Sequence, residues 1–168
     1  MDKLEQQNMK RKIILSLLMV MIVIFTTSCE LYVNYDQKAE DICKKVLKCL
    51  DEDDAAGLKS MFCQYSIETN GLEYEIKKGM EFYKGKTTNI DKIKFPNSSG
   101  KGVENGKTTE VTFSVSIDDI VTDSDNKYEV VVIEGYQVCT ADEKKVGISR
   151  IYIESEDGKE FTIGEYVD

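Results

Sequence analysis

The chain has 168 residues, of which 22 are basic, 31 are acidic and none is histidine, so its formal net charge is −9 at neutral pH. Without histidine it cannot form a Ser-His-Asp triad or a Cys-His pair, and it lacks the commonest transition-metal ligand. Its acidic charge repels the phosphates of nucleic acids and of anionic lipids, so we expect neither as a partner.

The chain begins with the pattern of a bacterial export signal. Lys10, Arg11 and Lys12 form a basic cluster, and residues 13–25 that follow it are apolar or nearly so. This stretch is shorter than the about 20 residues that a helix needs to cross a bilayer, but it matches the apolar core of a signal peptide. We therefore predict that residues 1–28 are a cleavable leader, which starts at Met1 or Met9.

The leader ends in small polar residues, Thr26, Thr27 and Ser28, directly before Cys29. This arrangement resembles the lipobox of bacterial lipoproteins, although Thr26 replaces the usual aliphatic residue. The resemblance implies that Cys29 carries a diacylglyceryl group, and two acyl chains suffice for stable anchoring. We expect a lipid-anchored protein on the extracytoplasmic face of the cell membrane; the alternative is an uncleaved signal anchor with a chance cysteine.

The residues after the leader are sufficient for one domain with a hydrophobic core. We predict a lipidated N-terminus and tether over residues 29–38 and a single domain over residues 39–168. The leader contains four basic and two acidic residues, so the rest of the chain has a formal net charge of −11. Solubility is the simplest explanation for this charge, and a cationic ligand is the alternative.

The first predicted helix starts at Ala39 and has the strongest amphipathic pattern in the chain. Its apolar residues recur with the spacing of one helix face. They are Ala39, Ile42, Cys43, Val46, Leu47 and Leu50. The acidic run 51–54 then resembles a calcium loop, but Ala55 and Ala56 stand where an EF-hand needs a ligand and a glycine. We interpret Asp53 or Asp54 as the N-cap of the next helix.

Two further helices are predicted before the pattern changes. The second helix is short and carries Leu58, Met61 and Phe62. The third helix begins after Gly71 and ends near Gly85, a residue suited to terminate a helix. Its apolar face consists of Leu72, Ile76, Met80 and Tyr83.

The second half of the chain has the period of strands. Val111, Phe113, Val115 and Ile117 alternate with polar residues, which indicates a strand with one buried face. We predict further strands over residues 88–95, 128–138, 146–154 and 160–166 and a mobile loop between Phe95 and Lys107. Turn-forming residues at 123–126 and 140–143 connect consecutive strands, so we expect an antiparallel meander.

Helices followed by strands predict an α+β domain with the helices packed on one face of a curved antiparallel sheet. The order of elements resembles the nuclear-transport-factor-2-like, or cystatin-like, cone. Residues 36–168 also resemble a family of Gram-positive lipoproteins known only as a domain of unknown function, through the stretches 55–62, 81–86, 106–110 and 146–153. This resemblance implies a fold and a location, but no activity.

Four cysteines follow Cys29, at Cys43, Cys49, Cys63 and Cys139. Their spacing matches no compact disulfide framework and includes no CxxC, so we expect no zinc and no other metal or cofactor. Cys43 lies on the apolar face of the first helix and is expected in the core. A disulfide between Cys49 and Cys63 is an alternative.

Two Gly-Lys-Thr triplets, at residues 85–87 and 106–108, suggest a phosphate-binding loop. Each lacks the additional glycine of that motif, because Met80 and Lys101 occupy its position. We interpret both triplets as turns that enter strands.

Four residues interrupt otherwise apolar strands: Glu134, Tyr136, Arg150 and Tyr152. If the sheet curls, some of them would point into its concave face and form a small-molecule site. The alternative is an ion pair between Glu134 and Arg150 across adjacent strands on the outer face. Bulges at Gly135 and Gly147 decide which face the four residues occupy.

These patterns favour a non-enzymatic, membrane-anchored domain that binds a small ligand or an envelope protein. The alternative is a cone-pocket enzyme that uses carboxylates with Tyr136 or Tyr152, which requires an enclosed pocket with a buried Asp or Glu. Protection against a partner toxin is a third hypothesis, based on fold analogy alone.

Overall fold

The structure, a computed structural model, describes residues 33–95 and 100–167. The predicted leader, Cys29 and part of the predicted loop after Phe95 lie outside these residues. The chain divides into two units, Met1–Asn34 and Tyr35–Asp168, and the second contains all the described helices and strands. No helix in the described part is long and apolar enough to cross a membrane.

Four helices occupy the first half of the described chain: α2 (Tyr35–Asp51), α3 (Ala55–Ser60), α4 (Gln64–Glu68) and α5 (Leu72–Phe82). Helix α2 begins four residues before the predicted start, so part of the predicted tether is helical. Asp36 lies in its first turn, where a negative charge interacts favourably with the helix dipole. Helix α4 was not predicted, because only Ser66 is buried in it and it has no apolar periodicity.

The acidic run after α2 is a helix cap, as predicted. Asp54 is the N-cap of α3, and its Oδ1 accepts a hydrogen bond of 2.8 Å from the backbone N–H of Gly57. This bond satisfies one of the free amides at the start of the helix. The side chain of Asp54 is therefore engaged in capping.

Seven strands form one antiparallel sheet. They are β1 (Thr87–Asn89), β2 (Lys92–Lys94), β3 (Lys101–Glu104), β4 (Lys107–Thr122), β5 (Lys127–Cys139), β6 (Gly147–Ser155) and β7 (Glu160–Gly164). Strands β4 to β7 are neighbours in chain order, which confirms the predicted meander. The three short strands β1, β2 and β3 all pair with β4.

Two strand predictions were wrong. The strand predicted over residues 88–95 is divided into β1 and β2, with Asp91 between them. Strand β3 was predicted as loop, but it forms a hairpin with β4. Asn105 and Gly106 have φ angles of 50° and 77° at its tip, which is the backbone of a tight hairpin turn. Both Gly-Lys-Thr triplets precede or enter strands, as predicted.

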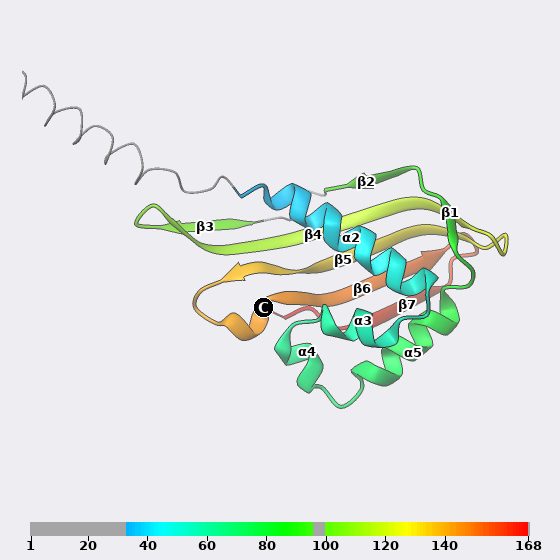
Figure 1. The fold of residues 1–168 in the computed structure, drawn as a ribbon, viewed down its shortest axis with the longest axis horizontal. Coiled ribbons are helices and arrows are strands. Elements are labelled where there is room, and N and C mark those ends of the chain that lie inside the picture. Colours follow the sequence, from blue (N-terminus) through cyan, green and yellow to red (C-terminus); the bar gives the residue numbers. More distant parts are fainter. Residues whose placement is uncertain (1–32, 96–99, 168) are drawn as a thin grey trace, which may run out of the picture. The chain divides into compact units, whose positions relative to one another are not determined.

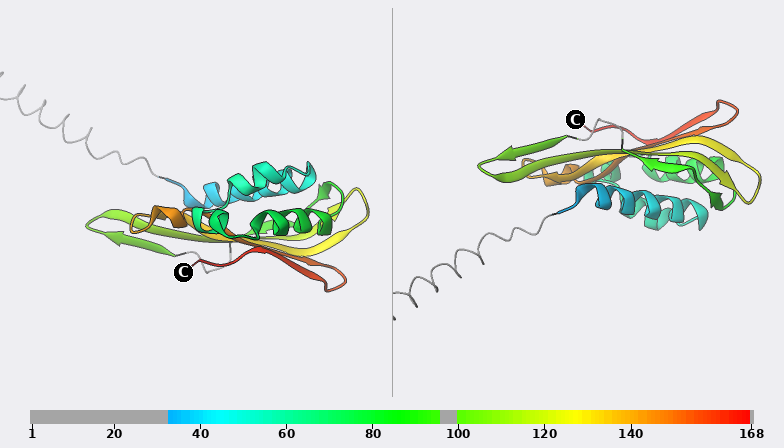
Figure 2. Two further views of the ribbon diagram at one scale, coloured as in Figure 1. Left: turned by 90° about the horizontal axis from the view of Figure 1, so that it is seen from below. Right: turned by 90° about the horizontal axis from the view of Figure 1, so that it is seen from above.

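The helices and the sheet form two layers. Figure 1 shows α2 crossing the sheet obliquely, and Figure 2 shows all four helices on one side of it. The sheet is curled like half a barrel, so the α+β class and the one-sided packing of the helices are confirmed. A two-layer arrangement of this kind leaves the second face of the sheet without a helical cover.

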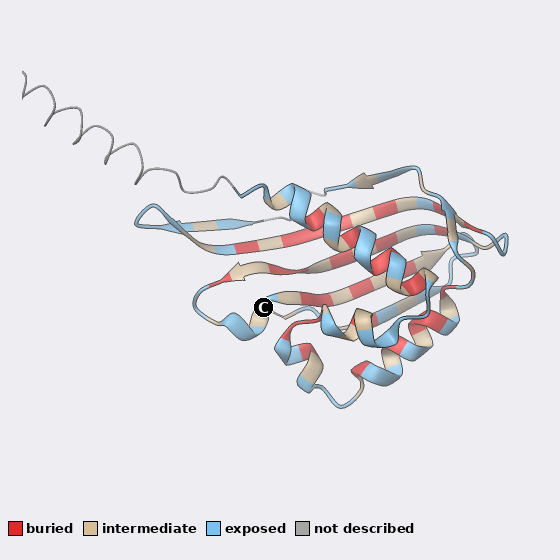
Figure 3. Ribbon diagram, in the orientation of Figure 1, coloured by how far each residue is buried: buried red, intermediate tan, exposed pale blue. Residues whose placement is uncertain are grey.

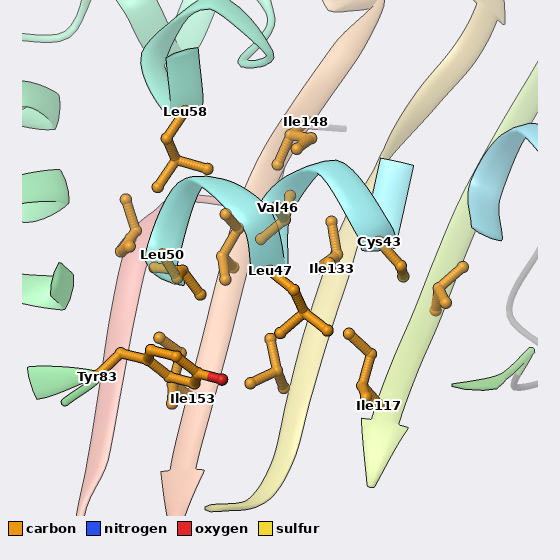
Figure 4. Close-up of a cluster of buried hydrophobic side chains, with 14 of the residues drawn as sticks. Cys43, Val46, Leu47, Leu50, Leu58, Tyr83, Ile117, Ile133, Ile148 and Ile153 are labelled. Carbon is orange, nitrogen blue, oxygen red and sulfur yellow. The ribbon is translucent and has the colours of Figure 1, made fainter. Parts of the chain in front are cut away.

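The core lies between the two layers. Along β4, β5 and β6, buried residues alternate with more exposed ones (Figure 3), as expected for strands with one buried face. The apolar face of α2 points at the isoleucines of these strands (Figure 4). The side chains that meet there include Cys43, Val46, Leu47, Leu50, Ile117, Ile133 and Ile153.

The four cysteines in the described part of the chain are free thiols. Cys43 is fully buried in the core, as predicted, and loss of hydration raises the pKa of its thiol to about 12. Cys49 and Cys63 do not form the disulfide that was considered as an alternative. Cys63 instead lies within 3.3 Å of the Ser66 hydroxyl.

A polar cluster joins the end of α2 to β1 and α5. One carboxylate oxygen of Asp51, Oδ1, accepts hydrogen bonds of 2.8 Å from both the backbone N–H and the hydroxyl of Thr87. The Thr87 hydroxyl also lies 2.6 Å from the hydroxyl of Tyr83, whose ring stacks on Tyr128 at 4.6 Å. Burial raises the pKa of Tyr83. These bonds fix the corner where the helices meet the sheet.

The outer edge of β7 is covered by α5. A side chain at Gly79 would place its Cβ 2.4 Å from Cδ1 of Ile163, so the helix backbone lies directly against the Ile163 side chain of β7. Glu75, one turn earlier on the same helix, accepts a hydrogen bond of 2.8 Å from the backbone N–H of Gly164. Helix α5 therefore provides both the packing and a hydrogen-bond partner for this edge.

We predict that Leu50→Ala lowers the free energy of unfolding by about 3 kcal/mol, because it leaves a cavity between α2 and the sheet. Leu50 is only 2% exposed. Urea denaturation monitored by circular dichroism measures the change, with Lys45→Ala on the exposed side of α2 as the control, which should change it by less than about 0.5 kcal/mol. Equal losses in both variants would contradict the assignment of Leu50 to the core.

Candidate functional site

The four predicted site residues lie on two neighbouring strands, β5 and β6. Residues next to them in sequence, such as Ile133 and Ile151, point into the core, and side chains alternate between the two faces of a strand. Glu134, Arg150 and Tyr152 therefore lie on the face opposite the helices, which we call the open face. Its side chains include Lys92, Lys94, Ser114, Ser116, Asp118, Val130, Val132, Glu134, Arg150, Tyr152, Glu154, Glu160 and Thr162.

Glu134 and Arg150 form an ion pair across the two strands. They are direct partners in the register, and Nε of Arg150 donates to Oε2 of Glu134 at 2.6 Å. The Nη2 nitrogen lies 2.5 Å from the same oxygen. The second carboxylate oxygen lies 3.5 Å from the hydroxyl of Ser114 on β4. The ion pair that was considered as an alternative is therefore present.

Tyr136 is separated from this pair by irregular pairing at Gly135. The register between β5 and β6 shifts between Glu134 and Gly135, so the expected bulge is present. A Cβ atom at Gly135 would lie 2.0 Å from the carbonyl oxygen of Gly147, so the two backbones are in contact. Tyr136 is buried, and Nζ of Lys145 lies 5.7 Å from its ring centroid. Tyr136 is thus shielded from solvent.

Tyr152 lies beside two glutamates that sequence reasoning did not identify. Its hydroxyl donates a hydrogen bond of 3.0 Å to Oε2 of Glu154, two residues along β6. Glu160 on β7 is directly opposite Glu154 in the register. Loss of hydration and the neighbouring carboxylates of Glu154 and Glu160 raise the pKa of Tyr152 to about 12. The alternation of side chains along β6 and β7 is the sequence pattern that could have identified Glu154 and Glu160.

The space between the helices and the sheet is filled by apolar side chains. The buried polar residues in the described part are Ser66, Ser114, Thr122 and Ser149, and none of these is a carboxylate. Hollows with volumes of 290 to 550 Å³ lie along α3, α4 and α5 and at the strand turns beside α5. Their described linings include none of the four predicted residues. None of these four hollows is lined by a side chain of the open face.

Cys29, the predicted site of lipid attachment, lies outside the described residues, so its lipidation stays a prediction. In the described part of the chain, no group of three or more His, Cys, Asp or Glu side chains is arranged to hold a metal ion. The side chains that the structure brings together on the open face can form ion pairs and hydrogen bonds with a partner.

Comparison with known families gives one match. The sequence profile of the family described as "Domain of unknown function (DUF5104)" matches residues 45–159. This stretch runs from the middle of α2 to the turn before β7 and includes strands β1 to β6. No curated protein matches the sequence significantly.

We predict that a double-mutant cycle with Glu134→Gln and Arg150→Met gives a coupling energy of about 1 kcal/mol in the free energy of unfolding, because one partner is largely shielded. The side chain of Glu134 is 16% exposed and that of Arg150 is 42% exposed. Chemical denaturation of the four proteins measures the coupling.

The more exposed pair Lys127–Glu156, 3.3 Å apart, is the matched control for this cycle. Its coupling should be below about 0.5 kcal/mol. Equal coupling in both cycles would show that shielding by the open face does not strengthen the Glu134–Arg150 pair.

Proposed function

The chain belongs to the DUF5104 family of domains of unknown function, and from this premise we propose that it is a non-enzymatic binding domain held by lipid at the extracytoplasmic face of the cell membrane. Its ligand is an envelope protein or a small molecule, and it binds on the open face. We further infer that the fold is of the nuclear-transport-factor-2-like type and that the family consists of Gram-positive lipoproteins. The curled sheet and the order of helices before the meander are compatible with this fold.

The observation that carries the proposal is the composition of the open face. Tyrosine and arginine are enriched in protein interfaces, and half-buried aliphatic side chains provide apolar contact area there. Tyr152, Arg150 and Val132 combine these properties on adjacent strands of a rigid sheet. A purely structural outer face would be served equally well by small polar residues such as Ser116 and Thr162.

The filled interior supports binding over catalysis. The alternative, a cone-pocket enzyme with carboxylate and tyrosine acid-base chemistry, needs a carboxylate in an enclosed, partly dry site, where its pKa can be tuned. Tyr152 has neighbouring carboxylates in Glu154 and Glu160, but all three lie on the open face. Tyr136 is buried next to Lys145 rather than to a carboxylate.

The sequence before α2 supports the anchor. The basic cluster, the apolar stretch and Cys29 follow one another as in a lipoprotein leader. Helix α2 starts at Tyr35, so only five residues lie between Cys29 and this helix, which gives a reach of about 20 Å when fully extended. A tether this short would keep the domain close to the membrane surface.

We predict that Cys29→Ala abolishes incorporation of a labelled fatty acid and leaves the leader uncleaved, because the thiol is the acceptor of the lipid. Metabolic labelling, followed by mass spectrometry of the N-terminal peptide, measures both effects. Cys49→Ala serves as the control for loss of a thiol and should be labelled and processed normally. Absence of label in the unmodified protein would refute lipid anchoring.

We predict that Tyr152→Ala weakens capture of the binding partner from envelope extracts by at least about tenfold, as for a central aromatic contact. The full chain serves as bait, and thermal-shift measurements with metabolites and cell-wall fragments test small ligands in parallel. Tyr74→Ala is the matched control, because Tyr74 is 67% exposed on α5, on the helical side. Equal capture by both variants would place binding elsewhere, and no ligand in either assay would leave a binding function without support.

A further inference from the structure

On the open face, the acidic side chains of β4 and β5 form ion pairs, whereas those of β6 and β7 do not in the described part of the chain. Asp118 pairs with Lys94, and Glu134 pairs with Arg150. Glu154 and Glu160 are directly opposite each other on β6 and β7, and neither forms an ion pair with a residue in the described part of the chain. The hydroxyl of Tyr152 donates a hydrogen bond to Glu154 and lies near Glu160.

This arrangement is unfavourable for the free protein. Like charges that are direct neighbours across two antiparallel strands destabilise the pair, whereas opposite charges stabilise it. A lysine or a neutral residue at position 160, opposite Glu154, would avoid this repulsion. The second carboxylate therefore adds nothing to the stability of the fold, and a cation supplied from outside would relieve the repulsion.

The residues around the two carboxylates indicate what kind of molecule would carry that cation. Val130 is opposite Glu154 on β5, and Val132 is opposite Tyr152, so a half-buried apolar strip runs beside the acidic pair. None of the four hollows described above is lined by these side chains, and small ligands generally need a concave site. A flat strip of this kind instead suits a segment of another protein.

We propose that the β6–β7 end of the open face, formed by Tyr152, Glu154, Glu160 and Val130, docks a basic segment of a protein partner. A lysine or arginine side chain of that segment lies between the two carboxylates, with its charge near the ring of Tyr152. The net charge of −9 attracts such a partner over longer distances. This inference rests on the proposed binding function and specifies the chemistry of its partner.

The test measures binding of fluorescent octalysine to the full-length protein in detergent by fluorescence anisotropy. The double variant Glu154→Gln/Glu160→Gln removes the two charges with little change in shape. Its matched control is Glu52→Gln/Glu143→Gln, which removes two exposed carboxylates, one from the turn after α2 and one from the turn before β6, and so changes the net charge equally. Octaglutamate serves as the negative probe.

We expect the first variant to bind octalysine at least about tenfold more weakly than the unmodified protein and the control variant to bind it within about twofold, because only local carboxylates are desolvated on docking. The melting temperature of the first variant should rise by about 1–3 °C without probe, because repulsion is removed. A rise in melting temperature together with weaker binding distinguishes a docking site from a residue pair that stabilises the fold.

Equal loss of octalysine binding in the two double variants would overturn the proposal, since binding would then depend on net charge alone. A fall in the melting temperature of Glu154→Gln/Glu160→Gln, or no binding of octalysine to the unmodified protein, would also overturn it. Self-association of the unmodified protein that this variant abolishes would instead identify a second copy as the occupant. If Tyr152→Ala loses the envelope partner while these charge tests fail, the binding function stands and only the basic chemistry of the partner is refuted.

Discussion

The packing of α2 across one face of the sheet is the contact on which the rest of the molecule depends. Its five core side chains cover the isoleucines of β4, β5 and β6, and they exclude water from this face. Because strand residues alternate strictly, burial of Ile133 and Ile151 at the same time commits Glu134 and Arg150 to the opposite face. The core thus determines which side chains lie on the open face, although the core residues themselves lie on the opposite face of the sheet.

The sequence predicts well the elements whose pattern is long and one-sided. Helix α2 and the meander of β4 to β7 have apolar residues at regular intervals, and both were located correctly. Short elements carry too few residues for such a pattern. Helix α4 buries only Ser66, and β3 contains Gly102 and ends in the turn at Asn105 and Gly106, so its strand character comes from pairing with β4.

The candidate site could be predicted only in part. Glu134 and Arg150 were identified as polar interruptions of apolar strands, and their pairing was foreseen as an alternative. The irregular pairing beside Gly135 could not be located, because a register shift is a property of two strands together and leaves no single-strand signal. Glu154 and Glu160 become noteworthy only when β6 and β7 are placed in register, since an isolated glutamate on a strand is an ordinary solvent-exposed residue.

The cover that α5 gives to β7 has a consequence for how the protein behaves in a crowded environment. Unpaired strand edges are the usual starting point for chain-to-chain pairing and aggregation. Here one amide of the β7 edge is occupied by Glu75, and the other side of the sheet is divided into strands of three, three and four residues. Neither border offers a long, straight template for another strand. Copies of this domain can therefore be concentrated side by side without merging their sheets.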